Sequence, residues 1–196
     1  MDHADHFSSS IDLAVTTIQG TDPARYGDSS PCTEYTVGKV IDHIAFGLLL
    51  AERSGLRQAI DLEWDVMGPA PFLIGHPEQE WAGLIAEQGR RTVSAWAEPK
   101  AWEGEATFGG GAMPAAAIGS MLLTDLVVHS WDVAVATGRT VDVSAALAQE
   151  TLAGVEALAQ MGRDGGWYGP EVELPDDASV LDKALAASGR DPKWTP

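Results

Sequence analysis

The sequence predicts an all-α protein in which four main helices form a bundle. Apolar residues recur at three- and four-residue spacing in several long segments, which is the period of a helix with one buried face. Clusters of Gly and Pro separate these segments. Hydrophobic residues make up 45% of the 196-residue chain and charged residues 21%, a balance typical of a packed core. We therefore expect one helical domain over residues 1–196, with an extra C-terminal helix and a short tail.

The first two predicted helices begin at polar caps. Residues 7–20 carry Ser8–Ser10 as capping candidates and end at Gly20. A turn-rich connection follows, and residues 36–60 then predict the second helix. Thr36 is the expected N-cap of this helix, because its hydroxyl can accept a hydrogen bond from a free backbone N–H of the first turn.

The third and fourth helices are predicted at residues 79–97 and 114–138, each after a long loop rich in Gly and Pro. A short extended piece around residues 106–108 is expected in the second of these loops. Pro114 suits the first turn of the fourth helix, and Gly138 ends it.

Two further helices follow the bundle in the prediction. Residues 142–162 form a fifth helix, with Ser144 as its cap and Gly162 as its stop. A short helix at 178–187 lies in the C-terminal tail, and one turn of strand is expected before it.

Charge and composition narrow the classes of function. The chain has 12 basic and 29 acidic residues, a net charge of −17, which argues against binding to nucleic acid or to an anionic membrane. We find no apolar run of roughly 18 residues and no signal peptide, and so expect a soluble cytoplasmic protein. The single cysteine, Cys32, rules out an intramolecular disulfide, and we expect it to be structural.

The five histidines fall into two groups. His3 and His6 are expected in a solvated N-terminal segment, and His76 at the surface of a Pro/Gly loop. His43 and His129 instead lie in the middle of apolar helices. A single histidine in such a place is usually a hydrogen-bonded core residue, but two on different helices also suggest a shared site.

The segment "MLLTDLVVHSWDVAVATG" carries three polar residues, Asp125, His129 and Asp132, at positions i, i+4 and i+7 on one side of a helix. They form either a polar seam facing water or part of a metal site. Asp125 and His129 can point at one ion, and His43 can meet them across the bundle. Two imidazoles and one carboxylate suit Zn²⁺, Ni²⁺ or Fe²⁺ and leave coordination positions open.

Asp132 has two interpretations. It can accept a hydrogen bond from a ligand imidazole and orient it, or it can pair locally with Arg139.

Three stretches resemble one family of proteins. The segments "SSPCTEYTVGKVIDHIA" (29–45), "TDLVVHSWDVAVATGR" (124–139) and "LDKALAASGRDPKWTP" (181–196) are similar in order and spacing to segments of actinobacterial DinB-like proteins. These relatives include mycothiol-dependent maleylpyruvate isomerase and, more distantly, the bacillithiol transferases.

The resemblance implies an up-down-down-up four-helix bundle that holds a divalent metal. By position, His43, Asp125 and His129 take the roles of the metal ligands. Two residues depart from the family pattern: Tyr35 stands where a Trp is usual, and Asp125 is one methylene shorter than the Glu often found there.

The function implied is that of a metal-dependent transferase or isomerase that uses a low-molecular-weight thiol, mycothiol, as cosubstrate. Metal coordination would stabilise the thiolate, which then attacks an electrophilic carbon of a small-molecule substrate, while Asp132 or a water handles protons. The alternatives are a non-catalytic metal-binding protein that forms a homodimer through the bundle, and a hydrolase in which metal-bound water is the nucleophile.

Overall fold

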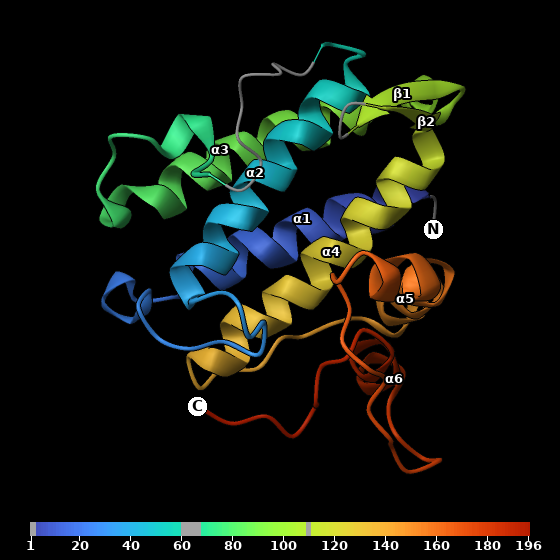
Figure 1. Ribbon diagram of the computed structural model, residues 1–196. Helices are drawn as coiled ribbons and strands as arrows, with labels where there is room; N and C mark the ends of the chain where they lie inside the picture. Colours follow the sequence, from blue (N-terminus) through green and yellow to red (C-terminus); the bar gives the residue numbers. More distant parts are fainter. Residues whose placement is uncertain (1–2, 60–67, 109–110) are drawn as a thin grey trace.

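The computed structural model describes residues 3–59, 68–108 and 111–196. Four long helices form the bundle: α1 (His3–Gln19), α2 (Val37–Gly55), α3 (Glu78–Trp96) and α4 (Ala115–Ala136). In Figure 1, α2 and α3 run in the same direction, opposite to that of α1 and α4. The predicted all-α class and the up-down-down-up arrangement are therefore confirmed.

Each bundle helix packs against two others. Both α4 and α3 contact α1 and α2, so α1 and α2 lie on one diagonal of the bundle. Outside the bundle, α5 (Ala145–Asp164) packs on α4, and α6 (Val180–Ala187) packs on α5 (Figure 1). The C-terminal third of the chain thus covers one side of α4.

The expected caps are in place. The Thr36 hydroxyl accepts a hydrogen bond from the backbone N–H of Lys39, and the Ser144 hydroxyl accepts one from that of Leu147. Helix α2 begins one residue after its predicted start, and α5 begins directly after its predicted cap, three residues into the predicted range. The predicted stop at Gly162 was wrong, because α5 continues to Asp164.

The loop before α4 is more regular than expected. Strand β1 (Glu105–Phe108) pairs in antiparallel register with β2 (Gly111–Pro114), and a 3₁₀ helix lies before them at Pro99–Trp102. Other short 3₁₀ helices in the described residues lie at Pro23–Arg25 and Pro71–Leu73, in the two preceding connections. Only the first strand was predicted. Pro114 ends β2 and precedes α4 rather than lying in its first turn. The strand expected before α6 is absent from the described residues 165–179.

The expectation for the N-terminal histidines was wrong for His6. Helix α1 already includes His3, and the side chain of His6 is buried against α5, with its Nδ1 3.8 Å from Glu150. Packing of α5 over the first turns of α1 makes this segment part of the folded structure. His3 itself is exposed and stacks on Trp102.

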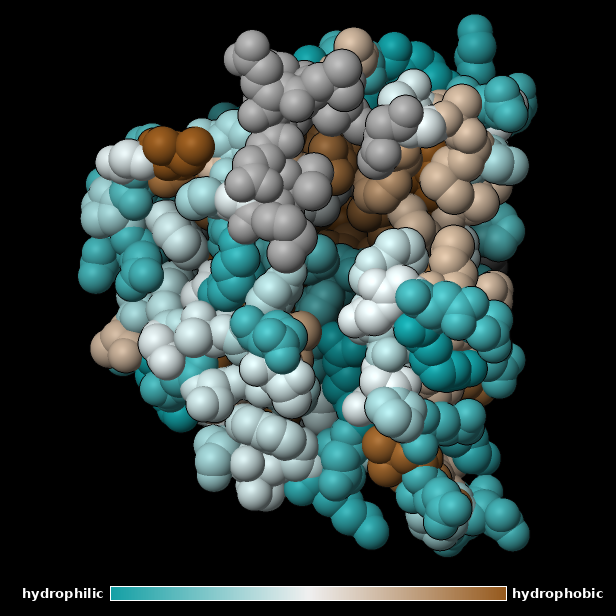
Figure 2. Space-filling view, viewed as in Figure 1, coloured by the Kyte–Doolittle hydropathy of each residue, from teal (hydrophilic) through white to brown (hydrophobic). Residues whose placement is uncertain are grey.

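Helix α4 is the core helix. By length and composition alone it passes as a membrane span, contrary to the expectation that no segment would, but 78% of its most apolar window is buried inside the protein. It is apolar on nearly all sides because α1, α2 and α5 surround it. The face shown in Figure 2 is largely hydrophilic in its lower part, and apolar residues gather over the hairpin and the start of α4.

Candidate metal site

The three predicted metal ligands converge where α2 packs against α4. His43 comes from α2, while Asp125 and His129 lie one turn apart on α4. The Nε2 atoms of both histidines lie 3.4 Å from the same oxygen, Oδ1 of Asp125. The ligand atoms of all three residues lie within 4.8 Å of one another.

This spacing fits a metal ion. At 3.4 Å the nitrogen-to-oxygen separations are longer than good N–H···O hydrogen bonds. Tetrahedral Zn²⁺ holds N and O ligands at about 2.1 Å, which puts neighbouring ligand atoms about 3.4 Å apart. The set of two imidazoles and one carboxylate also matches the donors that Zn²⁺ takes in sites with an open position.

One side of the site faces solvent. The side chains of His43 and Asp125 are 36% and 32% exposed, whereas that of His129 is 9% exposed. An ion held here would be shielded from solvent on the side of the buried His129 and accessible on the side of His43. The arrangement therefore suits a site that a small molecule can reach.

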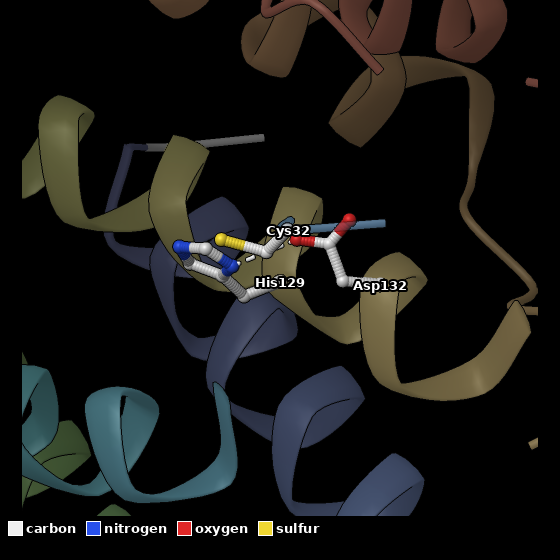
Figure 3. Close-up of side chains that lie close together, drawn as sticks. All are labelled: Cys32, His129 and Asp132. Atoms are coloured by element: carbon white, nitrogen blue, oxygen red, sulfur yellow. Dashed lines mark hydrogen bonds and ion pairs between the residues drawn. The ribbon is translucent and has the colours of Figure 1, made fainter. Parts of the chain in front are cut away.

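The second ring nitrogen of His129 is also engaged. Its Nδ1 lies 2.9 Å from Oδ2 of Asp132, one turn further along α4 (Figure 3). When Nδ1–H donates to this carboxylate, Nε2 carries the lone pair that a metal needs. This contact agrees with the orienting role predicted for Asp132.

The other predicted partner of Asp132 was wrong. Arg139 instead donates hydrogen bonds to the Thr17 carbonyl and to the Thr21 hydroxyl, which ties the end of α4 to α1. The cation beside Asp132 is Arg190, whose Nη2 lies 3.2 Å from Oδ2.

The turn after α6 places Arg190. Gly189 has a φ of +87°, and its N–H donates to the Ala186 carbonyl, while the N–H of Arg190 donates to that of Leu185. This is the pattern of a helix end closed by glycine in the left-handed conformation. It turns the chain back, and the guanidinium of Arg190 is buried against α4.

The charges of the site shift its pKa values in opposite directions. Burial by itself raises the pKa of Asp125, but His129 and His43 outweigh it and hold this pKa well below its usual range. Burial lowers the pKa of His129, but Asp125 and Asp132 outweigh it and raise this pKa to about 9. Without a metal, the imidazole of His129 is therefore protonated at neutral pH and bridges the two carboxylates.

Cys32 lies beside the site, which was not anticipated. Its sulfur is within 4.8 Å of ligand atoms of His129 and Asp132, against the imidazole ring (Figure 3). Burial raises the pKa of this thiol to about 11, so it is protonated and weakly nucleophilic at neutral pH. This state agrees with a structural cysteine.

The sequence interpretation gave no role to two further residues near the site, Arg190 and Tyr168. Burial and the charge of Asp125 raise the pKa of Tyr168 to about 12, so its phenol is neutral. Arg190 does lie in the tail segment "GRDPKW" that carried part of the resemblance. Helical spacing cannot reveal a contact between residues 132 and 190.

Comparison with known proteins gives related sequences and structures. The sequence model of the mycothiol maleylpyruvate isomerase N-terminal domain matches residues 9–134, well over half of the chain. The uncharacterized protein Rv0738 of Mycobacterium tuberculosis strain H37Rv, and its counterpart in strain CDC 1551, are 27% identical over 171 residues, 85% of each chain.

Solved structures support the same fold. The crystal structure of mycothiol-dependent maleylpyruvate isomerase superposes with a TM-score of 0.67 at 16% identity, covering 97% of this chain and 89% of that one. A variant of that enzyme with one histidine changed to alanine gives a TM-score of 0.66, covering 96% and 88%. At this identity the likeness concerns the fold. Together with the sequence match to most of the bundle, it shows that the chain belongs to the mycothiol maleylpyruvate isomerase N-terminal domain family.

Proposed function

We propose that the protein is a divalent-metal enzyme that uses a low-molecular-weight thiol, mycothiol, in an isomerase or transferase reaction on a small electrophilic substrate. The observation that carries the proposal is the convergence of His43, Asp125 and His129 on one point that is open to solvent. The family is named for a mycothiol-dependent isomerase, and membership of it supports mycothiol as the cosubstrate.

The residues of the site have different roles in this proposal. His43, Asp125 and His129 hold the metal, which when bound stabilises the thiolate of the cosubstrate. Asp132 has no exposed surface and contacts His129, so it orients this ligand rather than meeting substrate. The protonated thiol of Cys32 leaves the role of nucleophile to the cosubstrate.

Metal content tests the first part. We expect protein purified without chelators to carry about one divalent ion per chain and His129→Ala to lose it. His76→Ala is the matched control, because His76 lies at the surface and pairs with Glu80. Equal metal content in both variants and the parent would contradict the ligand assignment.

A binding assay tests the thiol. Mycothiol at a hundred times its dissociation constant should stabilise the metal-loaded protein by about 2.7 kcal/mol. The control ligand is mycothiol with its sulfur methylated, which keeps the sugar and loses the thiolate. Equal thermal shifts from both ligands, or none from either, would refute thiol coordination.

Turnover separates the reaction classes. The metal-loaded protein is incubated with mycothiol and a set of small electrophiles, and both free thiol and product are followed. Loss of free thiol indicates transfer, and a changed substrate with thiol retained, as for maleylpyruvate, indicates isomerisation. Substrate hydrolysis without mycothiol would favour metal-bound water as the nucleophile, and no reaction with any substrate would favour a non-catalytic scaffold.

A further inference from the structure

We propose that Arg190, carried by the tail after α6, is a positioning residue of the metal site that acts on His129 through Asp132. This inference rests on the metal site of the proposed function. It assigns to that site a residue lying 56 positions beyond the end of the family match at residue 134.

A continuous chain of contacts connects the tail to the ligand. The guanidinium Nη2 of Arg190 lies 3.2 Å from Oδ2 of Asp132, and the same oxygen lies 2.9 Å from Nδ1 of His129. The Nε2 of His129 lies 3.4 Å from Oδ1 of Asp125, the same oxygen that lies 3.4 Å from Nε2 of His43. Oδ2 of Asp132 therefore contacts both the guanidinium of Arg190 and the imidazole of His129.

Burial makes this pairing necessary for Asp132. Its side chain has no exposed surface, and Arg190 is 8% exposed. Within the described part of the chain, Oδ1 of Asp132 has no hydrogen-bond partner, so Oδ2 carries the contacts that compensate burial. A buried carboxylate without a counter-charge is strongly unfavourable, and it then protonates or moves. Either change weakens the acceptor that holds His129 in its metal-binding orientation.

The direction in which loss of Arg190 changes the metal affinity distinguishes a positioning role from a purely electrostatic one. A guanidinium near a metal ion repels it, so charge alone predicts that loss of Arg190 strengthens metal binding. Positioning predicts the opposite. Loss of a residue that supports a metal ligand typically weakens metal affinity 10- to 100-fold.

The test measures the affinity of the metal-free protein for Zn²⁺ by competition with a chromogenic chelator at fixed pH. We expect Arg190→Met to weaken binding about tenfold or more, and Asp132→Asn to weaken it by a similar factor. The double variant should bind no more weakly than Asp132→Asn alone, because Arg190 acts through Asp132. Arg190→Lys retains the positive charge and should recover part of the affinity.

Arg139→Met is the matched control. It also removes a partly buried arginine that joins α4 to another element, but its contacts are to α1 and not to the site. It should lower the unfolding temperature and leave zinc affinity unchanged. The absorption spectrum of bound Co²⁺ gives a second readout, which should change for Arg190→Met and not for Arg139→Met.

The outcomes are distinct. Unchanged or tighter zinc binding by Arg190→Met overturns the inference, as does a double variant weaker than Asp132→Asn by the full factor of the Arg190 change. Should Arg190→Met fail to fold, full affinity in Asp132→Asn overturns it. A parent protein that binds none of Zn²⁺, Ni²⁺ and Fe²⁺ refutes the proposed function instead, which is a separate result.

Discussion

Zinc binding should release about one proton at pH 7, because the ion displaces the proton that His129 holds in the metal-free site. The imidazole lies between two carboxylates, with Nε2 3.4 Å from Asp125 and Nδ1 2.9 Å from Asp132, and these charges raise its pKa to about 9. Metal ligands must be deprotonated at the coordinating nitrogen. The proton at Nε2 therefore competes with the ion at every pH below that value.

The magnitude follows from the difference between the assay pH and this pKa. Two pH units separate pH 7 from a pKa of about 9, so competition weakens zinc binding about a hundredfold at pH 7, or about 2.7 kcal/mol. Between pH 7 and 8 the measured affinity should rise about tenfold. Above pH 9 it should no longer depend on this proton.

Titration calorimetry in two buffers of different ionisation enthalpy measures the number of protons released. His76→Ala is the control, since its imidazole lies outside the site, and it should release the same number as the parent. An affinity that is flat from pH 7 to 8, with no proton released, would refute the bridging imidazolium.

In the metal-free protein, the free energy of unfolding should depend on pH through the same proton on His129. A raised pKa means that the folded state binds the proton more tightly than the unfolded state, whose histidine titrates near 6.5. The stabilisation is complete below pH 6.5 and is lost as pH rises towards 9. Saturating zinc should remove this dependence, and thermal unfolding of both forms across this range measures it.

Three further predictions concern packing and reactivity. Gly154→Ala should destabilise the fold by about 1–3 kcal/mol in urea unfolding, because the added methyl overlaps the Thr124 hydroxyl where α5 crosses α4, and Thr124→Ala in the same chain should recover most of the loss. Equal stability of the parent and Gly154→Ala would show that the helices separate freely. Ser144→Ala should cost about 1 kcal/mol by removing the cap of α5, whereas Ser144→Asp should cost less. Cys32 should react with iodoacetamide at pH 8 about a hundredfold more slowly than a thiol of ordinary pKa 9.0, since its pKa of about 11 leaves less thiolate, and an ordinary rate would contradict its burial.

The helices and part of the site were predictable because they depend on local rules. Asp125 and His129 share a helix face at a spacing of four residues, so any α-helix over this segment brings them together. Thr36 and Ser144 cap helices through contacts within three residues. His43 lies 82 residues before Asp125, so its place in an apolar helix only suggested that it could meet them, and the family resemblance supported the assignment.

The sequence by itself determined where the chain is helical and which side chains share a helix face, because helix periodicity and capping are set by neighbouring residues. Only the tertiary structure decided that His6 is buried, that Cys32 lies against His129 and that Arg190 pairs with Asp132. The residues in contact are 58 positions apart for Asp132 and Arg190, 97 for Cys32 and His129, and 144 for His6 and Glu150. No local period specifies them. The contacts of His6 and Arg190 form because α5, α6 and the tail pack over α1 and α4, and that of Cys32 forms because the connection before α2 lies against α4.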